Sequence, residues 1–269
     1  MSNEGAGRTA LVTGASAGIG RAFAEVLAER GYGLVLTARR HDRLEEVAAS
    51  LHATHGIPVH VIAADLADPT APARIVEMLA AQSLRIDVLI NNAGYGVPGR
   101  YAKTEWADHQ AFLQVMLISV CDLTHRLLPA MVERGWGRII NVASLAGLVP
   151  APAGHTLYAA AKAFLIRFSE ALAAENTERG VQVTALCPGF TYSEFHDVLG
   201  TRAAVSRMPR VMWMDARTVA EQGYRAVMDG RVVVVNGRLN GFVAWTMRML
   251  PQPVARYVVR RTGRAYRKT

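Results

Sequence analysis

Arg8-Thr-Ala-Leu-Val-Thr13, followed directly by Gly14-Ala-Ser-Ala-Gly18-Ile-Gly20, is the stretch that decides the fold of this chain. The first six residues form a short β-rich run, and a helical pattern extends beyond the last glycine to Glu29. A strand, a glycine turn and a helix in this order let the backbone approach a pyrophosphate at the N-terminus of the helix. An ordinary turn between a strand and a helix is the alternative, but the three glycines favour nucleotide binding.

Strands and helices alternate along the rest of the chain. Further strands are expected at 33–37, 58–63, 86–90, 137–143, 181–186 and 231–236, and helices at 42–53, 69–81, 105–134, 157–179 and 216–228. This alternation predicts an α/β fold, a doubly wound parallel sheet of about seven strands with helices on both faces. We expect residues 1–237 to form one domain and residues 238–269 to form a helical C-terminal extension.

Candidate ligand-binding residues follow the expected strands, because open α/β sheets bind ligands at the carboxyl ends of their strands. Arg39 and Arg40 follow the second strand and precede the first acid, Asp42. A guanidinium matches a phosphate group in two-pronged geometry. We therefore expect NADP(H) rather than NAD(H), with Arg39 as the main anchor of the 2′-phosphate. The alternative is that both arginines simply begin a solvated helix.

The third and fourth strands end in further candidates. Asp65 could accept a hydrogen bond from an adenine amino group, or it could cap a helix. The turn Asn91-Asn-Ala-Gly94 allows close backbone approach to a ligand, although its asparagines could instead brace neighbouring strands.

Tyr158 and Lys162 are four residues apart in an expected helix, so their side chains share one face. We expect the ammonium to lower the pKa of the phenol, which could then exchange a proton with a carbonyl or alcohol oxygen. The spacing alone also describes a packed tyrosine beside a lysine that reaches solvent. Ser144 stands at the end of the fifth strand, before a loop that leads into this helix.

Composition and termini narrow the class of protein. Hydrophobic residues make up 51% and charged residues 19%, as in a globular protein. Cys121 and Cys187 lie in apolar runs, so we expect reduced, buried thiols and a cytoplasmic location. The cysteines and histidines lack the spacing of metal ligands, so we expect no bound metal. The N-terminus lacks the basic and apolar regions of a signal peptide, so we expect none.

The net charge of +8 resides in the extension. From Arg238 to Thr269 the chain carries eight basic residues and no acidic one, which leaves 22 basic residues to balance the 22 acidic ones elsewhere. A basic tail suggests a lipid or nucleic-acid partner. No nucleic-acid motif accompanies it, so we expect no nucleic-acid partner. Pro251 divides the tail into two apolar, arginine-bearing segments. We expect a helical hairpin over the sheet edge or at a subunit contact, with peripheral membrane contact as the alternative.

The segment 190–214 is a long insertion at the expected ligand edge. It suits either a flexible lid over an apolar substrate or a small satellite core, because it is rich in Phe190, Phe195, Met208, Met212, Trp213 and Met214.

Taken together, these motifs resemble the short-chain dehydrogenase/reductase family over residues 8–237. The matching motifs stand in the family's order: Thr13-Gly-Ala-Ser-Ala-Gly-Ile-Gly20, Asn91-Asn-Ala-Gly94, Ser144, Tyr158-x-x-x-Lys162 and Pro188-Gly189. The resemblance implies a Rossmann-type fold, a nicotinamide cofactor and hydride transfer at a carbon–oxygen centre. It also implies a homodimer or homotetramer built largely from the helices before and after the fifth strand.

The resemblance also implies residue roles. Tyr158 would be the general acid for carbonyl reduction and the base for alcohol oxidation, Lys162 would lower its pKa and hold the nicotinamide ribose, and Ser144 would bind the substrate oxygen. Thr191 and Ser193 would steady the nicotinamide amide and the phosphates. The expected cofactor contacts are Gly14, Ser16, Gly18, Ile19, Gly20, Arg39, Asp65, Leu66, Asn92, Ala93, Gly94, Tyr158, Lys162, Pro188, Gly189, Thr191 and Ser193.

One residue departs from the family pattern. The family has a catalytic asparagine in the long helix, and counting back from Leu127-Leu-Pro129 places Met116 there. A methionine side chain cannot hold the water of a proton relay, although a backbone carbonyl at a helix irregularity could. We expect an NADP(H)-dependent oxidoreductase (EC 1.1.1.-) acting on a fairly apolar carbonyl or secondary alcohol. The alternative, supported only by Met116, is a cofactor-binding sensor or scaffold that has lost turnover.

Overall fold

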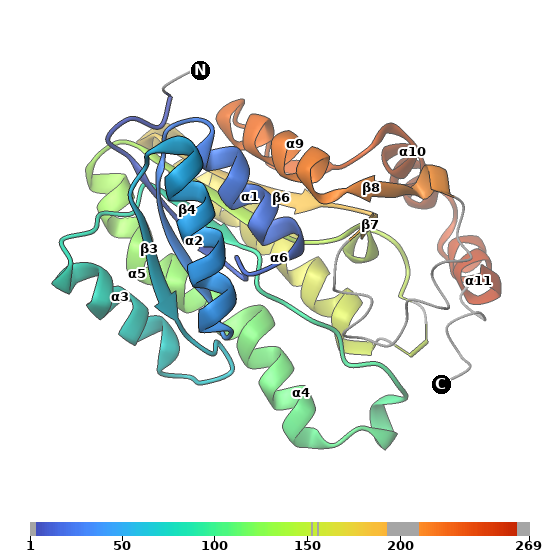
Figure 1. The fold of residues 1–269 in the computed structure, drawn as a ribbon. Helices are drawn as coiled ribbons and strands as arrows, with labels where there is room; N and C mark the ends of the chain where they lie inside the picture. The colour runs from blue at the N-terminus through green and yellow to red at the C-terminus, as the bar shows by residue number, and fades with distance from the viewer. Residues whose placement is uncertain (1–3, 152, 155, 193–209, 263–269) are drawn as a thin grey trace.

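A seven-stranded parallel sheet forms the centre of the protein, in the order β3-β2-β1-β4-β5-β6-β9 (Figure 1). The computed structural model describes residues 4–151, 153–154, 156–192 and 210–262. The central strands are apolar on both faces because helices cover both sides. The strands are β1 Thr9–Thr13, β2 Gly33–Ala38, β3 Val59–Ala63, β4 Val88–Asn91, β5 Gly137–Val142, β6 Val181–Cys187 and β9 Val233–Val235. The predicted doubly wound, Rossmann-type α/β fold is confirmed.

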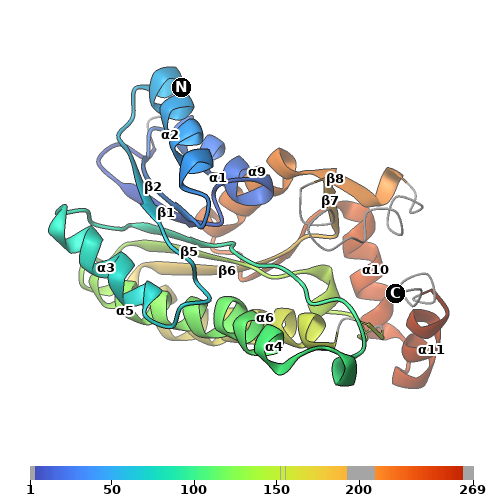
Figure 2. The same cartoon turned by 60° about the horizontal axis from the view of Figure 1, so that its bottom comes forward.

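Helices form a layer on each face of the sheet, as Figure 2 shows. One layer contains α1 Gly18–Ala28, α2 His41–His55 and α9 Ala216–Met228. The other contains α3 Ala71–Ala81, α4 Trp106–Leu113, α5 Ser119–Glu133 and α6 Thr156–Asn176. The extension consists of α10 Arg238–Met249 and α11 Gln252–Thr262, which lie beyond one edge of these layers.

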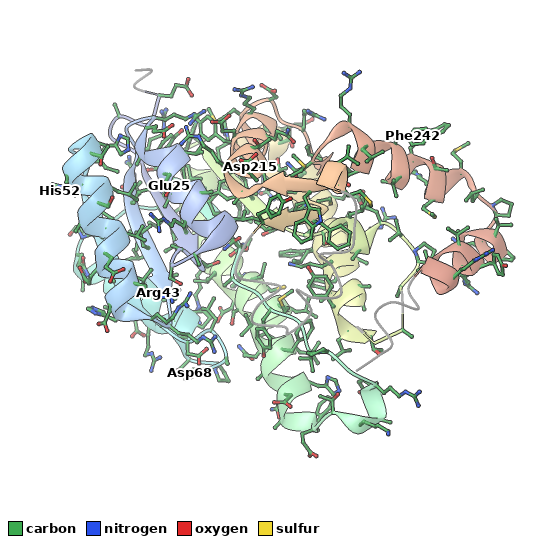
Figure 3. The ribbon with its side chains drawn as sticks, turned by 45° about the vertical axis from the view of Figure 1, so that its right-hand side comes forward. Glu25, Arg43, His52, Asp68, Asp215 and Phe242 are labelled. Carbon is green, nitrogen blue, oxygen red and sulfur yellow. The ribbon has the colours of Figure 1, made fainter. Side chains whose placement is uncertain are left out.

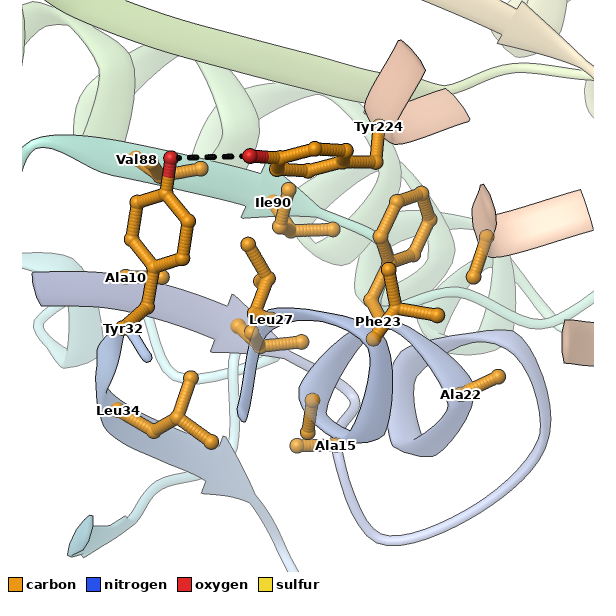
Figure 4. Close-up of a cluster of buried hydrophobic side chains, with 14 of the residues drawn as sticks. Ala10, Ala15, Ala22, Phe23, Leu27, Tyr32, Leu34, Val88, Ile90 and Tyr224 are labelled. Carbon is orange, nitrogen blue, oxygen red and sulfur yellow. Dashed lines mark hydrogen bonds between the residues drawn. The ribbon is translucent and has the colours of Figure 1, made fainter. Parts of the chain in front are cut away.

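The core of the first layer surrounds a buried tyrosine pair. Figure 4 shows Tyr32 and Tyr224 joined through their hydroxyls, 3.3 Å apart, above the apolar side chains of Phe23 and Leu27. The Tyr224 hydroxyl also donates to the Glu4 carboxylate at 2.6 Å. This contact fastens the N-terminal segment to α9.

The chain builds the sheet outward in one direction from β1 to β3 and in the opposite direction from β4 to β9. The two halves meet at β1 and β4, which are hydrogen-bonded neighbours. A reversal of this kind opens a crevice at the carboxyl ends of the two strands, where such sheets bind ligands. The ends are Thr13, which leads into the glycine turn, and Asn91, which leads into the turn at 92–94. The topology therefore brings two of the candidate motifs together.

The long helix predicted at 105–134 is interrupted. A π-helical segment, Gln114–Ile118, separates α4 from α5, and the Ser119 N–H donates to the Gln114 carbonyl five residues back. The Ser119 hydroxyl donates to the carbonyl of Leu66 at 2.8 Å, which ties this segment to the end of β3. The run Trp106–Glu133 is long and apolar enough to cross a membrane, but core helices of globular proteins share that composition. Here α5 packs against α3 and β5.

The described ends of the 190–214 insertion form a second, two-stranded parallel sheet. Its strands are β7, Phe190–Tyr192, and β8, Trp213–Asp215. The Trp213 ring lies between Phe190 and Tyr192, at centroid distances of 5.5 and 4.7 Å. Met214 packs on the main core, so the satellite core stays a prediction. Phe195 and Met208 lie outside the described residues, so the lid remains a prediction.

Candidate active site

The glycine turn forms a tight cradle at the start of α1. Gly14 and Gly18 have φ of +68° and +56°, a region that favours glycine. A Cβ on Gly14 would lie 2.8 Å from Asn92 Nδ2, and one on Gly20 would overlap the Gly14 carbonyl. No side chain caps the first turn of α1, so its N–H groups remain available to an anion.

Thr13 joins this cradle to the end of β4. Its hydroxyl oxygen accepts the N–H groups of Asn92 and Ala93 at 2.9 and 3.0 Å and donates to the Ile90 carbonyl. The Asn92 side chain donates to the Thr13 carbonyl at 2.9 Å. Asn91 likewise bonds side chains of neighbouring elements. The bracing role is therefore the one observed for both asparagine side chains, and the role of Thr13 in linking the two turns was not predicted.

The two arginines after β2 lie at the same edge and are exposed. Arg40 donates to the Ser16 hydroxyl at 3.2 Å, so it reaches the glycine turn. Within the described chain, no hydrogen bond or ion pair holds the guanidinium of Arg39. Burial raises the pKa of Tyr95, which lies beyond the end of β4, and the charge of Arg39 acts against this rise. Both arginines can therefore face a phosphate near the cradle, whereas sequence analysis chose Arg39 alone as the main anchor.

Asp65 and Leu66 follow β3 with different exposure. Asp65 is exposed, and one carboxylate oxygen accepts the Ala67 N–H at 3.0 Å. It does not cap α3, which begins six residues later at Ala71. The Leu66 side chain is buried in the core, so only its backbone can contact a ligand.

Ser144, Tyr158 and Lys162 meet at the carboxyl end of β5. The Lys162 Nζ atom lies 5.7 Å from the centroid of the Tyr158 ring and donates to the Val142 carbonyl at 2.6 Å. The Ser144 oxygen accepts the Ala146 N–H at 3.1 Å, which leaves its own hydrogen for the Tyr158 phenol to accept. The three predicted residues thus form one cluster.

Burial controls the ionisation of this cluster. It raises the pKa of Tyr158 to about 12, while the hydrogen bond with Ser144 acts in the opposite direction. It lowers the pKa of Lys162 to about 8. The expectation of a lowered Tyr158 pKa is not met, because burial is the largest influence on the phenol and the Lys162 ammonium is turned toward Val142. A phenol with a pKa of about 12 stays protonated at neutral pH and can act as a proton donor.

Cys187 lies beneath Lys162 at the end of β6 and is fully buried. Burial raises the pKa of its thiol to about 12, although the charge of Lys162 acts against this rise. Both cysteines are free, as expected, but Cys121 is only half-buried. Cys187 therefore contributes a neutral, apolar floor to the site.

Met116 forms part of an apolar wall behind Tyr158. It is 1% exposed and shares a cluster with Phe112 and Ala161, against which Tyr158 packs. Its sulfur occupies the space beside Gly94, where an added Cβ would lie 2.7 Å away. Met116 also lies within the π-helical segment, so the helix is irregular where a relay would need a backbone carbonyl.

The loop after β6 closes the site on the other side. The Pro188 carbonyl accepts the Leu145 N–H at 2.9 Å, which fixes this loop against the turn after Ser144. The Thr191 hydroxyl donates to the Gly189 carbonyl at 3.3 Å. Ser193 lies outside the described residues.

Asn240 of α10 is an unpredicted neighbour of this loop. A Cβ on Gly189 would lie 2.5 Å from Asn240 Nδ2, so only glycine fits between the loop and the extension. No motif in the extension signals this contact. It is a tertiary consequence of how α10 follows β9.

These features fit a dinucleotide with a pyrophosphate. The glycine cradle admits a backbone approach that a Cβ would block, and the uncapped start of α1 suits a phosphate. The arginines after β2 suit a further phosphate. Such a cofactor would extend from this cradle toward Tyr158 and Lys162 along the carboxyl ends of the strands.

Comparisons with known proteins agree with this site. The family described as "short chain dehydrogenase" matches residues 8–203. Sulfoacetaldehyde reductase of Chromohalobacter salexigens is 37% identical over 217 residues, which cover 79% of this chain and 85% of that protein. Very-long-chain 3-oxoacyl-CoA reductase-B of Danio rerio is 35% identical over 196 residues, 71% of this chain and 62% of that protein.

A solved structure shows the same likeness in three dimensions. The short-chain dehydrogenase from Sphingobium yanoikuyae in complex with NADPH superposes with a TM-score of 0.79 at 30% identity, covering 91% of this chain and 96% of that one. Because the family match spans most of the chain and a relative is 37% identical over 79% of it, the protein belongs to the short-chain dehydrogenase/reductase family of nicotinamide-dependent oxidoreductases.

Proposed function

We propose that this protein is an NADPH-dependent carbonyl reductase in which Tyr158 is the general acid. The observation that carries the proposal is the cluster of Ser144, Tyr158 and Lys162 at the ligand edge of the sheet. The pKa of about 12 keeps the Tyr158 phenol protonated at neutral pH, which suits reduction better than alcohol oxidation. Relatives named as reductases of sulfoacetaldehyde and of very-long-chain 3-oxoacyl-CoA support the same direction.

The proposed mechanism assigns one task to each side chain. Bound NADPH supplies the hydride. Ser144 donates a hydrogen bond to the carbonyl oxygen and stabilises the charge that develops there. Tyr158 gives its proton to that oxygen, and Lys162 in its charged form favours the resulting phenolate and holds the ribose of the cofactor. For this step the Ser144 hydroxyl turns its hydrogen from the Tyr158 phenol to the substrate, while the Ala146 N–H keeps its oxygen oriented.

Return of the proton to Tyr158 needs a route that does not use the Met116 side chain. The π-helical segment interrupts the regular i to i−4 hydrogen bonds, and interruptions of this kind are frequent at functional sites. We propose that a backbone carbonyl of this segment holds the water that supplies the proton.

A preference for NADP(H) is supported by the charge at the end of β2. Arg39 and Arg40 precede the acid Asp42, and Arg40 already contacts the glycine turn. A 2′-phosphate beside these residues would pair its negative charge with two guanidinium groups, whereas an uncharged 2′-hydroxyl would gain no charge pairing.

An apolar substrate is supported by the aromatic side chains after Gly189. Phe190 and Trp213 are partly buried, and Tyr192 is half exposed. Stacked rings beside the loop that closes the site suit an apolar or aromatic group next to the reacting carbonyl.

A homodimer or homotetramer through α5 and α6 is also proposed. Ile118 is 54% exposed, in the π-helical segment before α5, and Phe164 is 41% exposed on α6. Large apolar side chains exposed on these elements suit a contact with a second copy.

The test is NADPH oxidation with a panel of aldehydes, ketones and oxoacyl thioesters. Tyr158→Phe should reduce kcat by about 10²–10⁴-fold, the usual contribution of a general acid, while NADPH affinity stays within about twofold. Tyr257→Phe, on α11, is the matched control and should retain full activity. Unchanged turnover in Tyr158→Phe would remove this residue from the mechanism. Tight NADPH binding without turnover of any substrate would favour the sensor or scaffold.

A further inference from the structure

The outer side of α10 carries an apolar stripe. Phe242, Trp245 and Met249 are 60–66% exposed, and Leu239 precedes them at 38%. Their spacing places them within about a third of the circumference of the helix. Asn240, which is 3% exposed beside Gly189, lies on the opposite side. Figure 3 shows Phe242 on the side of α10 that points away from the domain. The amphipathic pattern is therefore inverted, with large apolar side chains directed outward.

The second helix of the extension repeats this arrangement. Val254 is 45% exposed and Tyr257 is 62% exposed, whereas Ala255 is buried at 1%. The exposed large apolar residues of the two helices, which we together call the outward face, are Leu239, Phe242, Trp245, Met249, Val254 and Tyr257. Phe242 and Trp245 stack at a centroid distance of 6.2 Å, which makes the centre of this face aromatic.

Positive charge surrounds the outward face. Arg238, Arg248, Arg256 and Arg261 are exposed on the same two helices. The sequence from Arg238 to Thr269 contains no acidic residue, while the rest of the chain is formally neutral. The partner of this face must therefore accept apolar side chains and supply negative charge at the same time.

These charges disfavour a second copy of the chain as the partner. In a two-fold contact the same patch meets itself, so arginines would approach arginines with no acid in the extension to offset them. A face with exposed tryptophan, phenylalanine and tyrosine among arginines instead matches the boundary of an anionic membrane, where rings enter the headgroup layer. The cytoplasmic leaflet of cell membranes carries this negative charge.

We propose that the outward face docks the protein on an anionic lipid bilayer, with α10 and α11 lying in the plane of the interface. The sequence alone favoured a packed hairpin or a subunit contact. The exposure of the apolar stripe, with its charge, favours the membrane instead. The proposal does not depend on the catalytic activity.

Vesicle co-sedimentation of the full chain tests this proposal. Vesicles of phosphatidylcholine mixed with phosphatidylserine should bind the protein, more weakly as salt is raised, and phosphatidylcholine alone should bind it at least about tenfold less. Combining Arg248→Gln and Arg256→Gln should weaken binding about 25-fold, or about fivefold per arginine. Combining Phe242→Ser, Trp245→Ser and Met249→Ser should weaken it by at least about tenfold.

Trp106→Ser is the matched control, because this tryptophan is 59% exposed on α4, outside the extension. Its vesicle binding should equal that of the unmodified protein, and circular dichroism checks the fold of every variant. Failure of the unmodified protein to sediment with the mixed vesicles would overturn the proposal. So would equal binding to neutral vesicles. Without vesicle binding, dissociation of an oligomer by the triple serine variant would assign the face to a second copy, and binding to duplex DNA would assign it to nucleic acid.

Discussion

The pKa of Lys162 gives a quantitative test of the site. Burial lowers it from 10.5 to about 8, which corresponds to about 3 kcal/mol against the charged form. The rate constant kcat/KM for NADPH reports ionisations of the free enzyme. If the ammonium is needed to receive the cofactor, kcat/KM should be nearly constant below about pH 7 and halved at about pH 8. It should then fall to about a tenth at pH 9 and about a hundredth at pH 10.

The assay is NADPH oxidation at a saturating carbonyl concentration between pH 6 and pH 10. Tyr158 and Cys187, each with a pKa of about 12, ionise outside this range and should not obscure the result. The arginine of Lys162→Arg stays charged at every pH in the range. The kcat/KM of this variant should therefore show no fall at alkaline pH, even if its value at lower pH is reduced. NADPH titration followed by fluorescence supplies the same profile without turnover.

Two results would refute this reasoning. A fall centred near pH 10.5 would show that Lys162 is not desolvated. A fall near pH 8 that persists unchanged in Lys162→Arg would belong to another group.

Three substitutions test other parts of the site. Arg39→Ala should raise the KM for NADPH at least about tenfold more than that for NADH, because only NADPH carries the 2′-phosphate, and equal losses would contradict the assignment. Met116→Asn should lower the pKa of Tyr158, because it places an amide in the apolar wall beside the phenol. Alcohol oxidation at alkaline pH should therefore be faster by up to about tenfold. An unchanged pH profile in a folded variant would exclude this effect. Gly20→Ala should destabilise the protein by about 2–4 kcal/mol in urea and abolish NADPH binding, because its Cβ would overlap the Gly14 carbonyl. Gly241→Ala, with no atom within 4 Å of the added Cβ, is the control and should not destabilise the protein.

Strong local signals explain which parts of the fold could be predicted. The helix predicted at 216–228 has those bounds in the structure, where Asp215 caps it by accepting the Thr218 N–H at 2.7 Å. The π-helical segment could not be predicted, because its residues are as suited to a regular α-helix as to a π-helix. The short strands β7 and β8 were missed because each depends on a partner distant in sequence.

The members of the cluster of Ser144, Tyr158 and Lys162 could be predicted, but their ionisation could not. The spacing of Tyr158 and Lys162 places them on one helix face, Ser144 stands at a strand end, and the resemblance to the family implies that the three belong together. The pKa of Tyr158 depends on its burial, to which the apolar wall of Met116 contributes, and on the hydrogen bond with Ser144. Both are tertiary features that no local pattern reports.

The contact between Asn240 and Gly189 bears on how the C-terminal region can be manipulated. A chain cut after Gly237 would leave an unfilled hollow beside the loop that follows β6, and its kinetics would reflect that defect as well as the missing helices. A cut after Pro251 would keep Asn240 and would remove α11 and the residues that follow it. Shortening the protein for crystallisation, or fusing a reporter to it, is therefore safest at this second boundary.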